Sequence, residues 1–107
     1  STAQTTETNV NGGIIDTKNL PVESATISLL KIKDSSVVKI GISDKEGKFS
    51  FTNSPLGSYF ITISAVGFTT TTSPAFSLSD ANRTIKLGIL ILKEVPKNLT
   101  AVVVTSK

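Results

Sequence analysis

Apolar and polar residues alternate over short stretches along most of the chain, and turn-forming residues separate these stretches. The clearest alternation covers residues 25–31, where Ala25, Ile27 and Leu29 fall on one side of an extended strand and should point inward. No stretch repeats its apolar residues at the spacing of a helix. The pattern therefore predicts β-strands at 10–16, 25–31, 37–43, 59–63, 69–72, 75–78 and 83–93, and another directly after a turn at 44–47.

Three of these strands carry further information about their position. The Gly12-Gly13 pair indicates a bulge or an edge position in the first strand, with frayed pairing. The strand at 83–93 is apolar on both faces, so we expect it to lie in the centre of a sheet. The strand at 37–43 has three apolar residues that should share one face: Val38, Ile40 and Ile42.

The stretch from 44 to 68 is the most informative part of the chain. Asp44 and Gly47 mark a tight turn, because Asp can bond its own backbone two residues on and glycine tolerates positive φ. Large side chains then alternate along two strands, which predicts a β-meander around a single core. The structural motif consists of Asp44, Gly47, Phe49, Phe51, Gly57, Tyr59 and Gly67.

Several short strands with turn signals between them predict an all-β fold, an antiparallel Greek-key β-sandwich of about seven strands. A chain of 107 residues is expected to form one domain around one core. We divide it into a flexible N-terminal segment at 1–9, the sandwich at 10–94, and a linker or strand at 95–107 that leads to a further C-terminal region.

The composition excludes several kinds of chemistry. The chain has no cysteine and no histidine, which removes disulfides, thiolate or histidine-ligated zinc, and Ser-His-Asp or Cys-His catalysis. We therefore expect no enzymatic activity and no cofactor. Eleven basic and eight acidic residues are scattered along the chain, which argues against nucleic-acid binding. The longest apolar run, at 87–92, is far below the about 20 residues that a membrane-spanning helix needs.

The remaining reactive or adhesive candidates have simpler structural interpretations. Asp44 and Glu46 could serve as an acid and base pair or bind calcium, but calcium needs about six to eight oxygen ligands and no such cluster is present. The Tyr59 hydroxyl is expected to tie a strand corner to nearby backbone. Five aromatic residues could form a sugar platform, but such surfaces favour Trp and Tyr, so core positions are favoured for Phe49, Phe51, Phe60, Phe68 and Phe76.

Five segments carry a resemblance to a known family: 13–16, 20–29, 43–51, 55–59 and 66–68. They include the motifs Asp44-x-x-Gly47-x-Phe49 and Gly57-x-Tyr59. In these residues the chain resembles the carboxypeptidase regulatory-like domain family over nearly its whole length. The resemblance implies a transthyretin-like, or prealbumin-like, sandwich that is not catalytic even when it accompanies a peptidase.

The loop at 33–39 and the ending formed by 87–92 and 99–105 are similar to the version of this domain that opens bacterial outer-membrane β-barrel proteins of the TonB-dependent receptor type. The resemblance implies a periplasmic accessory domain of a transporter in the bacterial cell envelope, at the periplasmic face of the outer membrane. Its partners would be the plug and barrel of its own chain, and the energising protein TonB. The candidate docking strand for TonB is an uncharged, largely β-branched stretch formed by Ala101, Val102, Val103, Val104 and Thr105. The same stretch could instead be a linker or a strand that closes this sandwich.

Two other functions remain open. The domain could be a binding or spacer module of a secreted adhesin or glycan-processing protein, or the regulatory domain of a metallocarboxypeptidase. The sequence on either side of this chain would distinguish the three functions. A plug and barrel after it would indicate the receptor, another sandwich would indicate the adhesin or glycan-processing protein, and a zinc-ligand motif before it would indicate the metallocarboxypeptidase. Self-crosslinking adhesin domains have a similar shape, but their Lys-Asn bond needs a lysine on the first strand, and residues 10–16 contain none.

Overall fold

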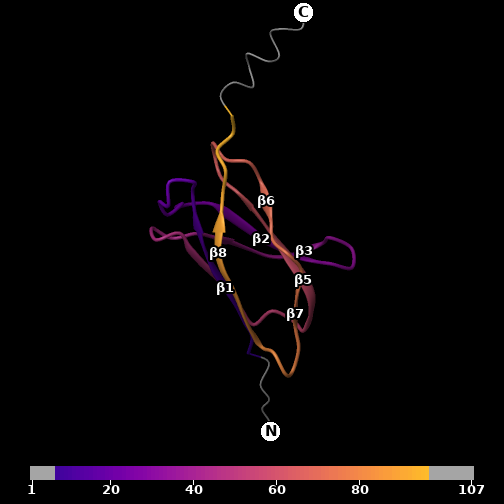
Figure 1. The fold of residues 1–107 in the computed structure, drawn as a ribbon. Helices are drawn as coiled ribbons and strands as arrows, with labels where there is room; N and C mark the ends of the chain where they lie inside the picture. The colour runs from indigo at the N-terminus through magenta and orange to yellow at the C-terminus, as the bar shows by residue number, and fades with distance from the viewer. Residues whose placement is uncertain (1–6, 97–107) are drawn as a thin grey trace, which may run out of the picture.

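The computed structural model describes residues 7–96, which form eight strands in two sheets and no helix (Figure 1). The all-β sandwich expected from the alternating pattern is confirmed, and each of the predicted stretches overlaps one of the eight strands. The strands are β1 (Asn9–Ile15), β2 (Thr26–Lys31), β3 (Val37–Ile42), β4 (Lys48–Thr52), β5 (Gly57–Ser64), β6 (Thr71–Thr72), β7 (Phe76–Leu78) and β8 (Thr84–Ile91).

In the larger sheet, β2 and β5 follow the alternating pattern closely. Its strand order is β3-β2-β5-β6, and β7 also pairs with β5. β2 and β5 are antiparallel, with Ile27 opposite Ile63 and Leu29 opposite Ile61. These four side chains and Ala25 are completely buried, so the inward direction expected for Ala25, Ile27 and Leu29 is confirmed.

The smaller sheet has the order β4-β1-β8. β1 is antiparallel to β4 and parallel to β8, so the chain contributes its first and last described strands to one parallel pair. The register between β1 and β8 shifts between Asn11 and Gly13, where β8 holds one extra residue. A bulge therefore lies beside the Gly12-Gly13 pair, but its extra residue belongs to β8 and not to the first strand, where the bulge was expected.

The two sheets enclose one core. Val10, Ile14, Phe49 and Phe51 come from the smaller sheet, and Leu92 joins them just after β8. The core residues of the larger sheet come from β2, β5 and β7, and they include Tyr59 and Leu78. Phe60, Phe68 and Phe76 are only half-buried, so the expected core position is found for Phe49 and Phe51 but not fully for the other three.

The expected positions of the first and last strands were wrong. β8 is an edge strand, because only β1 pairs with it in the sheet. Its outward apolar residues, Ile89 and Ile91, are 61% and 52% exposed rather than covered by another layer. β1 is the central strand of its sheet and is not frayed, since Val10 and Ile14 are completely buried.

The expected common face of β3 was also wrong. Leu29 pairs with Lys39 and Leu30 with Val37, so Val38 is an extra residue that interrupts the alternation. Val38 packs against the core, whereas Ile40 and Ile42 are exposed. The irregularity also directs Lys39 toward the other sheet, where its ammonium donates a hydrogen bond to the Thr52 carbonyl oxygen of β4.

Candidate functional site

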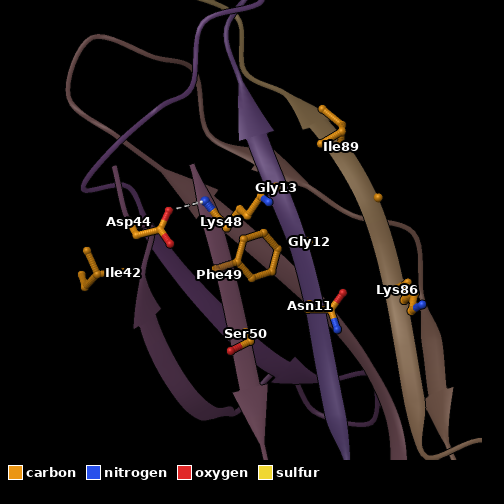
Figure 2. Close-up of a pocket in the computed structure, with 11 residues that line it drawn as sticks. Asn11, Gly12, Gly13, Ile42, Asp44, Lys48, Phe49, Ser50, Lys86 and Ile89 are labelled. Carbon is orange, nitrogen blue, oxygen red and sulfur yellow. Dashed lines mark hydrogen bonds between the residues drawn. The ribbon is translucent and has the colours of Figure 1, made fainter. Parts of the chain in front are cut away.

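An open groove of about 660 Å³ lies against the smaller sheet, over β4, β1 and β8 (Figure 2). Side chains on the outer face of these strands form most of its lining: Asn11, Lys48, Ser50, Lys86 and Ile89. Ile42 and Asp44 line the margin, at the end of β3 and in the turn before β4.

Gly13 leaves the groove side of β1 without a side chain at its position. A Cβ at Gly13 would lie 3.0 Å from Cδ1 of Ile89, on the outer face of the sheet. Gly12 faces the opposite side, where a Cβ would lie 2.9 Å from Cζ of Phe49 and 3.1 Å from the Gly88 carbonyl oxygen. The bare backbone of Gly12 therefore lets the Phe49 ring pack directly against β1.

The polar groups of the groove are two lysines, two neutral side chains and one carboxylate. The Asn11 side-chain amide donates to the Asn9 side-chain oxygen at 2.6 Å. The Asp44 carboxylate accepts hydrogen bonds from the backbone N–H groups of Glu46 and Lys48, each at 2.9 Å. Asp44 is therefore engaged in its own turn, and the Asp44–Glu46 pair is not arranged as an acid and base across a cavity.

No group of three or more potential metal-ligating side chains occurs within residues 7–96. The same part of the chain contains no helix with the length and apolar character needed to cross a membrane. What the groove offers chemically is two cationic side chains beside an exposed isoleucine and bare backbone.

The Asp44–Gly47 turn fastens the start of β4 to β1. The Gly47 N–H donates to the Asp44 carbonyl oxygen at 2.9 Å, and the Gly47 carbonyl oxygen accepts from the Ile14 N–H at 2.7 Å. Gly47 has φ +77°, and a Cβ there would lie 2.3 Å from the Ile14 carbonyl oxygen. Glycine is thus required at this position both by its conformation and by the close approach of β1.

Tyr59 lies near the start of β5, at the corner where the chain enters this strand. Its hydroxyl donates to the Pro55 carbonyl oxygen at 2.6 Å, and its side chain is almost completely buried. Burial raises the pKa of Tyr59 above its ordinary value. Gly57 precedes it with φ +152°, and a Cβ there would make only ordinary contacts with the Tyr59 ring. The Tyr59 hydroxyl therefore fixes the corner to the backbone of Pro55, and its proton is used in that hydrogen bond.

Gly67 lies at the end of the sandwich where the described chain leaves. It has φ +88°, with open space around the position of a Cβ. The Gly67 carbonyl oxygen accepts from the Val95 N–H at 3.0 Å, and the Thr69 N–H donates to the Lys93 carbonyl oxygen at 2.8 Å. The segment after β8 is thus fastened to the turn that contains Gly67.

The seven motif residues do not converge on one site. Asp44, Gly47, Phe49 and Phe51 support the smaller sheet, while Gly57 and Tyr59 form the corner and Gly67 lies in the exit turn. The candidate docking strand, Ala101 to Thr105, lies outside the described residues. The groove residues Asn11, Lys48 and Lys86 were not predicted from the sequence, and the signal that could have pointed to them is the bare Gly12-Gly13 backbone.

Comparisons with known proteins define what the chain is similar to. The model of the carboxypeptidase regulatory-like domain family matches residues 9–87. A search of curated proteins finds no match. Solved structures with the same fold include the Bacillus anthracis TIE protein, which is 23% identical with a TM-score of 0.67 over 83% of this chain. A streptococcal ancillary pilin is 19% identical with a TM-score of 0.66 over 88% of this chain.

The likeness covers only part of these longer proteins. The chain spans 17% of the TIE protein and 34% of the ancillary pilin. A third structure, Klebsiella pneumoniae 5-hydroxyisourate hydrolase, is 18% identical with a TM-score of 0.57, over 80% of this chain and 86% of that enzyme. Because pilins and a hydrolase share the architecture at such low identity, the likeness identifies the fold and not an activity.

Proposed function

Because the chain belongs to the carboxypeptidase regulatory-like domain family, we propose that it is a non-catalytic module that joins and spaces other parts of a bacterial cell-envelope protein. The observation that carries this proposal is the parallel pairing of β1 and β8. The described chain enters the sandwich at the start of β1 and leaves beyond the end of β8, at the opposite end (Figure 1). Such a module adds its own length between the segments that precede and follow it.

Two further observations support the same proposal. The structures similar to this chain include an ancillary pilin and a major pilin subunit of Bacillus cereus, and both are longer than this chain. The Asp44 carboxylate beside the groove over the smaller sheet is held within its own turn by two backbone N–H groups, which is a structural role. A spacer or interaction module accounts for both.

The experiment is a domain exchange in the full-length protein that contains this chain. Residues 9–94 are replaced by an unrelated β-sandwich whose chain also enters and leaves at opposite ends, by a sandwich whose ends lie together, or by nothing. The measured quantity is the accessibility of the following segment to an antibody at the cell surface. If the domain is a spacer, only the first replacement should preserve this accessibility. Equal accessibility in all three variants would contradict the proposal.

A second candidate function is the accessory domain of a TonB-dependent outer-membrane receptor. The uncharged stretch Ala101–Thr105 favours it, because its β-branched residues suit addition to the edge of a partner sheet. The test is a titration of the matching TonB C-terminal domain into this chain and into its Val103→Pro variant. Proline removes a backbone donor, so binding should be lost in the variant. No binding by the unaltered chain, or equal binding by both, would exclude this docking role.

A chelator tests the expectation that this domain needs no metal. A metal that binds only the folded state adds stability by mass action, so its removal lowers the thermal midpoint. We expect EDTA to leave the midpoint unchanged. A fall that added calcium restores would instead point to a metal site in this domain.

A further inference from the structure

The first and last described strands of the sandwich form a single parallel pair, and this arrangement determines how the domain responds to tension. The pairing extends from Asn9 opposite Thr84 to Ile15 opposite Ile91. Tension transmitted through the chain pulls the start of β1 one way and the end of β8 the other way. The two strands would then have to slide past each other along their common axis.

The direction of the force decides how many hydrogen bonds resist it. In a parallel pair such as β1–β8 the hydrogen bonds are evenly spaced along the strands and slant across from one strand to the other, so sliding strains all the bonds of the pair together. A force that peels one strand away from its end strains them one after another. We propose that the β1–β8 pair is a mechanical clamp, by which this domain withstands tension along the chain without a covalent crosslink.

The clamp is fastened at both ends. The Asn9 N–H donates to the Arg83 carbonyl oxygen at 2.8 Å, and the Leu92 N–H donates to the Ile15 carbonyl oxygen at 2.8 Å. The bulge opposite Gly12 interrupts the ladder of hydrogen bonds between these ends. Because the bulge fits at only one position, it fixes the register of β1 against β8. Sliding by one residue would turn buried side chains such as Val10 and Ile14 toward solvent.

β1 is also held on its other edge. It pairs with β4 from Asn9 to Gly13, and beyond that pairing the Ile14 N–H donates to the Gly47 carbonyl oxygen at 2.7 Å. The Ile14 carbonyl oxygen accepts from the Val22 N–H at 3.0 Å. Pulling β1 out of the sheet therefore breaks bonds on both of its edges, which adds to the resistance of the clamp.

The segment that follows β8 provides a weaker first barrier. Residues 93–95 bond to the turn at 67–69 through two hydrogen bonds, Thr69 N–H to Lys93 O and Val95 N–H to Gly67 O. These bonds lie nearer to the pulled end than β8 does. They should break before the clamp and appear as a short extension that precedes the main unfolding event.

Single-molecule force measurements on the whole chain test the clamp. The absence of natural cysteine allows handles to be placed at introduced cysteines. One variant is pulled from Ser1→Cys and Lys107→Cys, which slides β1 along β8. The other is pulled from Ser1→Cys and Ala81→Cys, an exposed position just before β8, which peels β1 away from its first residue. We expect an unfolding force at least about twofold higher in the first geometry, because its bonds are strained together. Equal forces would overturn the proposal.

A pair of variants separates the clamp from general stability. Asn9→Pro removes the donor to Arg83 O, while Ile63→Val removes a methyl group from the core of the larger sheet. The force between residues 1 and 107 should fall with Asn9→Pro and stay unchanged with Ile63→Val, even where both lower the thermal midpoint. Equal reductions would show that the force follows overall stability and would reject the clamp. If Asn9→Pro does not fold, the two pulling geometries of the unaltered sequence still decide the question. The clamp goes beyond the spacer role, and its failure would leave the result of the domain exchange untouched.

Discussion

The two sheets of this sandwich are specified in different ways. In the five-stranded sheet, β2 and β5 place apolar side chains inward at every second residue, and pairs such as Leu29 and Ile61 fill the space. In the three-stranded sheet, close approach of backbone matters as much as side-chain volume. Gly12 accommodates the Phe49 ring, and Gly47 lies against the Ile14 carbonyl oxygen. The stability of the five-stranded sheet should therefore depend most on side-chain atoms that are removed, and that of the three-stranded sheet on atoms that are added.

The largest effect should follow removal of a core side chain from the five-stranded sheet. Ile61 is completely buried on β5, so Ile61→Ala leaves a cavity and should lower the free energy of unfolding by about 2–5 kcal/mol. Ile40→Ala makes the same chemical change on the same sheet at an exposed position and should cost no more than about 0.5 kcal/mol. Urea denaturation of both variants measures the contrast. Similar losses at the two positions would mean that side-chain packing does not specify this sheet.

The three-stranded sheet should be sensitive to a single added methyl group. Gly47→Ala combines a left-handed backbone with a Cβ only 2.3 Å from the Ile14 carbonyl oxygen, so strain and overpacking together should cost about 2–4 kcal/mol.

Gly67→Ala is the matched control for this substitution. It has the same left-handed backbone, with φ +88°, but open space around the new methyl group. Its cost should be only about 1–2 kcal/mol, from the backbone conformation alone. Denaturant midpoints of the two variants isolate the contribution of the close contact. Equal midpoints would show that β1 can move away from the turn and that the approach is not essential.

The same difference explains which parts of the fold could be predicted from the sequence. The central strands of the five-stranded sheet, β2 and β5, could be predicted because alternation at 25–31 and 59–63 is a local property of the chain, whereas the irregularity in β3 could not. The position of β8 could not, because its apolar residues on both faces suit a central strand as well as an edge strand with exposed Ile89 and Ile91. The role of Gly12 was equally hidden, since it depends on a ring that arrives from β4.

In the candidate site, too, the local features could be predicted from the sequence and the features that depend on distant strands could not. The Asp44–Gly47 turn and the Tyr59 corner lie within short segments, so their residues could be identified from their spacing. The groove draws Asn11, Lys48 and Lys86 from three strands that are distant in the sequence. Only the pairing of β1 with both neighbours brings them together, and periodicity along one strand does not reveal that pairing.

Two turn positions allow a smaller contrast between backbone conformation and side-chain bonding. Gly57 has φ +152°, which a β-branched residue rarely adopts, so Gly57→Val should cost about 1–3 kcal/mol. Asp44→Ala removes two exposed hydrogen bonds to backbone and should cost about 1 kcal/mol. Chemical denaturation of both variants ranks them. A larger loss for Asp44→Ala would show that its carboxylate has a role beyond the turn.

The smallest expected effect concerns the Tyr59 hydroxyl and depends on pH. Tyr59→Phe keeps the buried ring but removes the hydrogen bond to Pro55 O, which should cost about 1 kcal/mol near neutral pH.

Burial raises the pKa of Tyr59 in the folded state, so above the ordinary value of 10.0 the unfolded chain loses this proton first. The unaltered domain should therefore lose stability as pH rises above that value, while below it this group contributes no pH dependence. Tyr59→Phe should lack this part of the loss, so the stability difference between the two proteins should shrink as pH rises. Urea midpoints measured across this range provide the test, and a constant difference would mean that the folded state accommodates the ionised phenol.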